Sequence, residues 1–471
     1  MMIDAKPLVL DVDGTFLKTD MLLETFWHAL GRRPIKCLAI CFRNFGNRAL
    51  LKQELATIAP LRTDLLPVNP QIADLAARSI DLGRDVIFAS GSDQTLVTQL
   101  AHDHGFSDKV FASDGEVNLT GSRKANALVA AFGKGGFDYA GDNAVDRPIW
   151  QVAENAILVG NHRQIAAELA AKGRNVEEFG GSWRFRDLLR AMRPHQWVKN
   201  ILLFLPLIAA HRIETAGVLI VLAAAVAYSL AASSIYIVDD LLDLEADRLH
   251  ATKKNRPFAS GAVPILVGML ASVLLGGFAL GLAYVISLPM LGIVALYMSL
   301  SLAYSLKLKR MRWVDIATLA ALYTLRVIAG AVAAKVLASG FLVAFIFPAF
   351  ITLGCVKRLT ELALATNDDK LPGRGYGRLD RSDLLNVAGL GTFGSLLVFF
   401  LYSFTNAATA LYANIWILWL TLIPIGGWLL RMIVLGWQGK QDYDPIVFAM
   451  RDKYGLAIIA VILAFLFTAS G

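Results

Sequence analysis

Four aspartates gather where a long apolar run ends, in the segment YIVDDLLDLEADRLHATKKNRPFASG at residues 236–261. Asp239, Asp243 and Asp247 recur every four residues, so a helix would carry their carboxylates along one face, with Asp240 beside them. Anions this close repel one another near a low-dielectric membrane boundary and need a cation. Mg²⁺ suits them, because it favours a few carboxylates together with substrate phosphates. The alternative is a solvated acidic helix end without a metal.

Basic side chains in the neighbouring segments could bind the phosphates. They lie in RPHQWVKN, KKNRP, YSLKLKR and CVKRLTE, and the candidates are Lys199, Arg256, Lys307, Lys357 and Arg358, with Glu361 beside them. Arg326 differs from these because it lies inside an apolar run. A charge in such a place is costly and normally faces a polar cavity or a partner. Membrane topology alone explains many of the loop cations, but it does not explain Arg326.

A second set of chemical groups begins near the N-terminus. The segment PLVLDVDGTFLKTD runs from a short apolar stretch directly into Asp11 and Asp13. Later segments, each after an expected strand or turn, supply a hydroxyl, a lysine and two more carboxylates: Ser90 in DVIFASGSD, Lys124 in LTGSRKANAL, and Asp142 and Asp146 in FDYAGDNAVD. These residue types suit nucleophilic and acid–base chemistry beside a metal.

The elements that must position these groups fall into two parts. The chain has 471 residues and is 56% hydrophobic, which is too apolar for an ordinary soluble protein. Residues 1–180 read as a mixed soluble domain, 181–199 as a linker with an amphipathic interfacial helix, and 200–471 as a transmembrane domain. Nine spans are expected, at residues 200–211, 216–238, 264–284, 288–305, 314–334, 340–356, 383–404, 411–430 and 454–470.

The placement of charge predicts the topology of the spans. The net charge is +7, but Lys and Arg concentrate in alternate loops, and the opposite loops hold only Arg212 and Lys335. This bias predicts that the basic loops are cytoplasmic, and it explains the charge without nucleic acid. No signal-peptide pattern precedes the first domain, which is therefore expected in the cytosol. Cys37, Cys41 and Cys355 suggest neither a disulfide framework nor a zinc site.

The pattern DDLLDLEADR…RPFASG resembles the first aspartate-rich motif of the UbiA superfamily of intramembrane prenyltransferases. The resemblance implies about nine helices and a cytoplasmic Mg²⁺–diphosphate site, with Asp240, Asp243 and Asp247 as metal ligands. The family usually begins this motif with Asn, where this chain has Asp239. Aromatic prenyltransferases of the superfamily carry a second aspartate pair, but here WVDIATLAALYTLRVIAG offers only Asp315.

The basic motifs, taken together, resemble one branch of that superfamily, the polyprenyl-phosphate phosphoribosyltransferases. RPHQWVKN, YS..LK…DI, LR.IAG, KR..E and DYDPIVFAMRDKYG carry the likeness over about residues 185–471. It implies phosphoribosyl pyrophosphate as donor and a long-chain polyprenyl phosphate as acceptor. Tyr304 and Asp315 join the phosphate-binding candidates, and Asp444 and Asp452 are further polar contacts.

The N-terminal motifs resemble those of the haloacid-dehalogenase-like (HAD) phosphatases, whose DxDGT follows a strand. The resemblance implies an α/β Rossmann-like fold, with a small helical cap included in the mostly helical residues of about 20–80. It makes Asp11 the nucleophile and Asp13 both the acid/base and, through its backbone carbonyl, a metal ligand. Ser90 would bind phosphate, and Lys124 would stabilise the phosphoaspartate. Asp142 and Asp146 would complete the Mg²⁺ site.

The expected function is therefore a bifunctional membrane enzyme with Mg²⁺ in each domain and both sites on the cytoplasmic side of the plasma or inner membrane. It would make polyprenyl-phosphoryl-phosphoribose and then remove the 5-phosphate, leaving polyprenyl-phosphoryl-ribose for synthesis of an arabinose donor. Two alternatives stay open: an aromatic prenyltransferase that uses prenyl diphosphate, and a transporter or lipid-binding protein with a regulatory HAD module. A homo-oligomer is also open.

Overall fold

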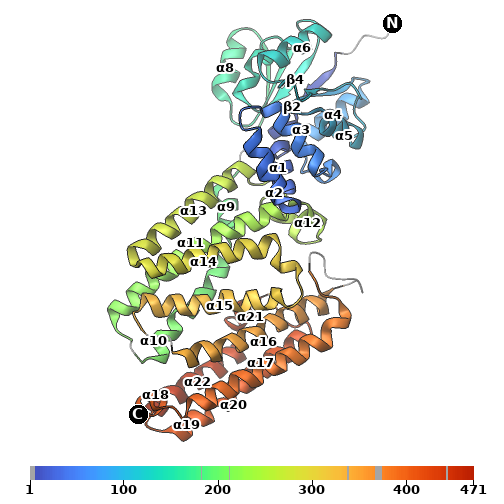
Figure 1. Cartoon of the computed structure of the whole chain (residues 1–471). Helices are drawn as coiled ribbons and strands as arrows, with labels where there is room; N and C mark the ends of the chain where they lie inside the picture. The colour runs from blue at the N-terminus through green and yellow to red at the C-terminus, as the bar shows by residue number, and fades with distance from the viewer. Residues whose placement is uncertain are drawn as a thin grey trace. The chain divides into compact units, whose positions relative to one another are not determined.

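The computed structural model describes residues 6–181, 183–211, 213–336, 339–365, 374–441 and 444–470 (Figure 1). Arg212, one of the two basic residues expected in the opposite loops, lies outside them. The chain divides into two compact units. Unit 1 comprises Met1–Met192 and Ile237–Ala271, and unit 2 comprises Arg193–Tyr236 and Ser272–Gly471. The aspartate-rich segment therefore belongs to the same unit as the N-terminal residues.

Unit 1 is built on a parallel sheet of six strands. The spatial order is β3-β2-β1-β4-β5-β6, and every pairing is parallel. The strands are β1 (Leu8–Leu10), β2 (Val86–Asp93), β3 (Phe111–Ser113), β4 (Asp138–Gly141), β5 (Asn155–Val159) and β6 (Asn175–Phe179). Leu8 pairs with both Val86 and Asp138, so β1 is central. The strand order reverses direction at β1, and in such sheets ligands bind beyond the carboxyl ends of the strands at that point.

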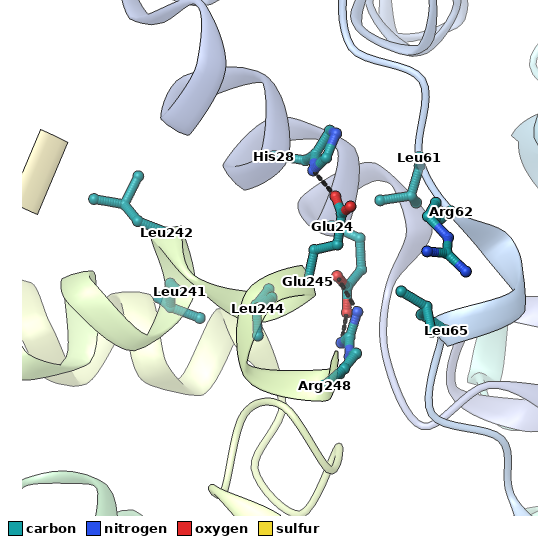
Figure 2. Close-up of a pocket in the computed structure, with 10 residues that line it drawn as sticks. All are labelled: Glu24, His28, Leu61, Arg62, Leu65, Leu241, Leu242, Leu244, Glu245 and Arg248. Atoms are coloured by element: carbon teal, nitrogen blue, oxygen red, sulfur yellow. Dashed lines mark hydrogen bonds and ion pairs between the residues drawn. The ribbon is translucent and has the colours of Figure 1, made fainter. Parts of the chain in front are cut away.

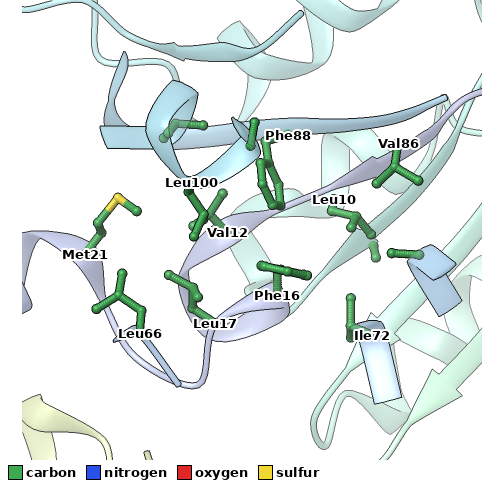
Figure 3. Close-up of a cluster of buried hydrophobic side chains, with 14 of the residues drawn as sticks. Leu10, Val12, Phe16, Leu17, Met21, Leu66, Ile72, Val86, Phe88 and Leu100 are labelled. Carbon is green, nitrogen blue, oxygen red and sulfur yellow. The ribbon is translucent and has the colours of Figure 1, made fainter. Parts of the chain in front are cut away.

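Helices cover both faces of this sheet. Along β1, Leu8 and Leu10 belong to one buried cluster, which Figure 3 shows with Phe16 and Phe88, while Val9 belongs to another. This alternation follows from the two-residue period of a strand, and burial on both faces is typical of parallel sheets. The helices of this part are α1 (Met21–Arg32), α2 (Pro34–Arg43), α3 (Arg48–Ile58), α4 (Pro70–Asp81), α5 (Gln94–Asp103), α6 (Ser122–Phe132), α7 (Arg147–Trp150), α8 (Arg163–Ala171), α9 (Phe185–Ala191) and α12 (Leu244–Leu249).

Among the described residues, eight helical segments are long and apolar enough to cross a membrane. They are α11 (Thr215–Leu242), α13 (Ile265–Ile286), α14 (Leu288–Leu306), α15 (Val314–Ala333), α16 (Gly340–Leu364), the segment Arg378–Tyr402 containing α17 (Arg381–Tyr402), the segment Ile415–Trp437 containing α19 (Ile415–Leu420) and α20 (Leu422–Trp437), and α22 (Lys453–Ser470). Shorter helices of unit 2 are η4 (Pro194–Phe204), α10 (Leu205–Ala209), α18 (Asn406–Leu411) and α21 (Pro445–Ala449).

The fold class expected from the sequence, an α/β HAD-like domain with a small cap followed by nine transmembrane helices, is wrong. The first expected span, residues 200–211, consists of the end of the 3₁₀ segment η4 and the five-residue helix α10. A span needs about 20 helical residues to cross the hydrocarbon layer. The corrected description is a predominantly helical chain with multiple membrane-spanning helices and a small parallel sheet in its N-terminal region.

Candidate functional site

The carboxyl ends of neighbouring strands bring the N-terminal carboxylates together. Asp11 follows β1 directly, and Asp142 follows β4, the strand paired with β1. The loop after Asp11 turns sharply at Gly14, whose φ is 73°. A Cβ at Gly14 would lie 2.1 Å from Oδ2 of Asp142, so only glycine allows this approach. The DxDGT pattern thus places two acidic loops against each other.

Three of these carboxylates form a site with the chemistry of a cation-binding site. Asp11, Asp142 and Asp146 each offer a ligand oxygen, and these oxygens all lie within 4.8 Å of one another. The Oδ2 atom of Asp146 is buried and has no hydrogen-bond partner. Burial raises the pKa of Asp142 to about 8, and its carboxylate neighbours Asp11 and Asp146 add to the shift. An oxygen-ligated divalent cation would relieve both the repulsion and the orphaned oxygen, so the residues fit Mg²⁺.

Lys124 stands on another side of the same carboxylates. It extends from α6, and its Nζ lies 3.0 Å from Oδ1 of Asp11 and 3.4 Å from Oδ1 of Asp146. The hydroxyl of Tyr139, 2.9 Å from Nζ, donates in turn to Asp146 Oδ1 at 3.1 Å. Burial alone would lower the pKa of Lys124, but Asp11 and Asp146 outweigh it and the pKa is raised. The ammonium is therefore held charged beside Asp11.

Asp13 lies in a different environment. It accepts hydrogen bonds from the backbone N–H of Met21 at 2.7 Å and from the hydroxyl of Ser92 at 2.6 Å, with the hydroxyl of Ser90 at 3.4 Å. Burial raises the pKa of Asp13 to about 6, and Asp20 contributes to the rise. The structure therefore brings the expected Ser90 to Asp13, but the shorter bond comes from Ser92, which the sequence analysis missed.

Lys52, like Tyr139, is a polar residue of this region that sequence reasoning missed. It lies on α3, and its Nζ donates to the backbone carbonyl of Gly91 and, at 3.0 Å, to Oδ1 of Asn118. Gly91 separates the two serines that contact Asp13. The sequence around Lys52 does not indicate this contact, because its partner Gly91 lies on β2, far along the chain.

The aspartate-rich segment does not form one continuous helix. Helix α11 ends at Leu242, and Asp243 has φ −105° and ψ 15° before α12 begins. The guanidinium of Arg256 bridges the two buried carboxylates, at 3.1 Å from Asp240 and 2.7 Å from Asp247. Burial raises the pKa of Asp247, although Arg256 opposes the shift. Asp239 and Asp243 are half-buried.

This segment contacts α1 through charged groups that line a pocket (Figure 2). The Glu24 carboxylate is almost fully buried and accepts two hydrogen bonds from Arg248, at 3.0 and 2.5 Å. Nδ1 of His28 lies 3.1 Å from Glu245. The other lining residues are mostly leucines: Leu61, Arg62, Leu65, Leu241, Leu242 and Leu244. Arg248 also donates to the carbonyl of Ala259 at 3.0 Å, which fixes the loop around Arg256.

In unit 2, Arg358 organises one polar cluster. Its guanidinium, fully buried, makes a bidentate pair with Asp315 at 2.6 and 2.9 Å and donates to the hydroxyl of Tyr304 at 2.9 Å. It also pairs with Glu361. Arg374, which was not expected, donates to the same Tyr304 hydroxyl at 3.2 Å. Four expected site residues are thus in direct contact.

A second cluster of unit 2 joins residues far apart in the chain. Nζ of Lys199 lies 2.5 Å from Asp444, which also accepts from the hydroxyl of Tyr323 at 3.2 Å. Arg326 donates to Asn200 at 3.2 Å and to Tyr297 at 3.0 Å. The rings of Tyr228, Tyr297 and Tyr323 surround the Arg326 guanidinium.

Three other expected residues lie apart from these contacts. Lys357 is half-buried, and within the described parts of the chain it has no hydrogen bond or ion pair. Lys307, at the end of α14, is exposed. Asp452 is paired with Arg431 at 3.0 Å and not with a ligand-binding group.

Comparison with known proteins agrees with the membrane part of this arrangement. Residues 201–451 match the UbiA prenyltransferase family, and the chain belongs to that family. A relative in Sinorhizobium fredii, Uncharacterized protein y4nM, is 34% identical over 97% of this chain and 89% of its own length. Decaprenyl-phosphate phosphoribosyltransferase of Mycobacterium tuberculosis is 33% identical over 56% of this chain and 88% of its own length.

A UbiA homologue from Archaeoglobus fulgidus, solved with GPP and Mg²⁺, is also similar. Its TM-score is 0.46 and its identity 13%, over 60% of this chain and 99% of that chain. The family match covers residues 201–451, and none of these comparisons supports the HAD domain that the sequence predicted for the N-terminal part.

Proposed function

We propose that the chain is a phosphoribosyltransferase that moves phosphoribose from phosphoribosyl pyrophosphate to a polyprenyl phosphate. The observation that carries this proposal is the 33% identity to decaprenyl-phosphate phosphoribosyltransferase over 273 residues. The polar residues of unit 2 support it. Asp315, the one acidic residue of the second motif, is fully engaged by Arg358. A second pair of carboxylates for a prenyl diphosphate clamp is therefore not supplied there.

The chemistry requires many cations because donor and acceptor both carry phosphates. In the reaction, the bond from the anomeric carbon to the diphosphate breaks, an oxygen of the lipid phosphate forms the new bond to that carbon, and pyrophosphate leaves. Asp240, Asp243 and Asp247, with Asp239 beside them, have the donor chemistry for Mg²⁺, which would neutralise the departing diphosphate. The phosphate-binding roles fall to Lys199, Arg256, Lys307, Arg326, Lys357 and Arg358, which act by position and charge.

We propose a second activity at the carboxyl end of the unit 1 sheet, removal of the ribose 5-phosphate from the lipid product. A carboxylate oxygen of Asp11 would attack phosphorus while the bond to the ribose oxygen breaks, and Asp13 would give that oxygen its proton. Water would then attack the phosphoaspartate and lose a proton to Asp13, releasing phosphate and restoring Asp11. Lys124, held charged beside Asp11, suits the stabilisation of the phosphoryl group.

Both sites are proposed to face the cytoplasm of the plasma or inner membrane, because the basic residues concentrate in one set of loops. The product would be a polyprenyl-phosphoryl-ribose, the type of compound from which a lipid-linked arabinose donor is made. An Mg²⁺ ion bound by Asp11, Asp142, Asp146 and the backbone carbonyl of Asp13 would screen the incoming phosphate.

The test uses full-length protein in nanodiscs, supplied with phosphoribosyl pyrophosphate, a polyprenyl phosphate and Mg²⁺. The wild type should release pyrophosphate and then inorganic phosphate. Asp11→Asn should abolish phosphate release and leave pyrophosphate release intact, whereas Asp243→Asn should reduce pyrophosphate release. Asp108→Asn is the matched control, because Asp108 is exposed and has no ion pair among the described residues.

Two results would overturn the assignments separately. Phosphate release from the lipid product that survives in Asp11→Asn removes the proposed phosphatase. Pyrophosphate release that needs a prenyl diphosphate and an aromatic acceptor, and not phosphoribosyl pyrophosphate, replaces the proposed transferase.

A further inference from the structure

Helix α2 exposes an apolar face in the N-terminal part of unit 1. Ile35, Leu38 and Phe42 of α2, with Phe45 just after it, are exposed to 84%, 57%, 90% and 90%. The spacing of three and four residues puts Ile35, Leu38 and Phe42 on one side of the helix, and Phe45 follows in the turn after it. The opposite side packs into the unit, where Cys37 and Ile40 are buried in a cluster with Leu55. The helix is therefore apolar on two faces, and only one of them is covered by the fold.

The exposed face is larger than isolated surface residues explain. Elsewhere in the N-terminal part, the exposed large apolar residues are fewer or less exposed, such as Ile80 (44%) and Leu82 (74%) at the end of α4, or Phe185 (64%) and Leu189 (39%) on α9. Two phenylalanines exposed to 90% are rare on a surface that meets only water, and a contiguous exposed apolar patch marks an interaction site.

The charged residues around this face indicate which kind of partner it binds. Residues 25–53 contain no Asp or Glu, but they contain six cations: Arg32, Arg33, Lys36, Arg43, Arg48 and Lys52. Arg32 pairs with Glu245, and Arg43 pairs with Glu54. Among the described residues, Arg33, Lys36 and Arg48 form no ion pair, and all three are exposed. An apolar stripe with phenylalanines and flanking free cations has the composition of a helix that lies in the interface of an anionic membrane.

We propose that α2 docks on the lipid surface, with Ile35, Leu38, Phe42 and Phe45 entering the headgroup–acyl boundary and the cations meeting anionic headgroups. A second copy of the chain fits this face poorly, because Arg33, Lys36 and Arg48 of one copy would repel the same cations of the other. The inference goes beyond the enzymatic proposal and does not rest on it. It requires only the membrane association that the family and the spans establish.

The docked helix would also place the helices between β1 and β2 beside the lipid. That insertion carries Lys52, which reaches Gly91 next to the serines of the Asp13 site. The headgroup of a lipid-linked substrate would then reach the Asp13 site at the surface of the membrane.

The experiment places an environment-sensitive fluorophore on a cysteine at position 42 of the full chain, with Cys37, Cys41 and Cys355 replaced by alanine. The labelled protein is reconstituted in nanodiscs of phosphatidylcholine, with or without phosphatidylglycerol. Iodide reports exposure to water, and spin-labelled acyl chains report contact with lipid. A fluorophore at position 82 is the matched control, since Leu82 is equally an exposed apolar residue of unit 1.

We expect iodide quenching at position 42 to fall several-fold when phosphatidylglycerol is present, and lipid quenching to rise, with no change at position 82. Arg33→Glu, Lys36→Glu and Arg48→Glu together should restore access to iodide. Equal iodide access at both positions would overturn the proposal, as would protection that follows protein concentration and not lipid composition. Slower hydrogen exchange of residues 34–45 in anionic nanodiscs provides the same test on wild-type protein if the cysteine-free background does not fold.

Discussion

The ion pair between Glu24 and Arg248 offers a sharp test of how unit 1 holds the aspartate-rich segment. The side chains are 1% and 7% exposed, so both charges have lost nearly all their water. Arg248 donates twice to Glu24 and once to the carbonyl of Ala259. Glu24→Ala removes the only carboxylate that contacts Arg248 in the described part of the chain, and it leaves a buried, unpaired guanidinium.

Breaking a buried ion pair in this way costs about 3–5 kcal/mol, because the remaining charge keeps its desolvation penalty. The loss falls on α12 and the loop to residue 261, so that segment should open more often while distant helices do not. At about 3 kcal/mol, amide exchange in residues 244–261 should be faster by a factor on the order of one hundred. Pyrophosphate release should fall as well, since Asp247 precedes Arg248 and Arg256 depends on the same loop.

The assay is hydrogen–deuterium exchange by mass spectrometry on full-length protein in nanodiscs. Glu168→Ala is the matched control, because Glu168 and its partner Arg147 are both about half exposed, so the loss of this ion pair should cost at most about 1 kcal/mol. The double variant Glu24→Leu with Arg248→Met should recover much of the protection, since an apolar pair leaves no buried charge. Unchanged exchange at residues 244–261 in Glu24→Ala would refute the reasoning.

Three further predictions concern the two polar sites. The pKa of Asp142 in the folded protein is about 8, above its ordinary value. The free energy of unfolding of the metal-free protein should therefore fall as the pH rises from about 4 to 8. With chelator present, Asp142→Asn should raise the melting temperature at pH 8 and leave it unchanged at pH 4. Gly14→Ala should abolish phosphate release and spare pyrophosphate release, because the added Cβ meets Asp142 at 2.1 Å. Asp315→Asn should cost about 1.5–3 kcal/mol, seen as an earlier thermal transition in detergent, because Arg358 loses its bidentate partner but keeps its pair with Glu361. Arg358→Lys should lower the transition as well, because a lysine cannot form the bidentate pair.

The sequence predicted which N-terminal carboxylates lie together better than it predicted the polar residues around them. Asp11 and Asp142 follow strands, and the carboxyl ends of adjacent parallel strands must meet, so their proximity follows from local signals. Ser92 and Tyr139 lie in the same segments as Ser90 and Asp142, and the two-residue period of a strand could have placed Ser92 on the same side as Ser90. Lys52 carries no such signal, because it reaches the site from α3 through long-range packing.

The membrane spans, too, were predicted where the local sequence determines the structure and missed where it does not. Length and hydropathy predicted most of the helices, because each must satisfy its own backbone in a medium without water. Length and hydropathy did not distinguish residues 200–211 from a membrane span, since a short apolar 3₁₀ segment has the same composition as part of a span. The expected run of carboxylates along one helix also failed, because helical spacing says nothing about the break at Asp243.

The contacts of three arginines explain why the sequence could suggest a phosphate-binding site but could not say which cations bind the phosphates. Arg358 and Arg256 each lie between two carboxylates, and Arg326 lies among three tyrosine rings. An arginine between two carboxylates is already neutralised and contributes mainly to position, whereas Arg326 and Lys357 contact no carboxylate in the described structure. A polyanionic substrate gains most from charges that are not yet compensated. The uncompensated cations inside the apolar helices α15 and α16 are therefore the first residues at which loss of charge should weaken substrate binding without unfolding the protein.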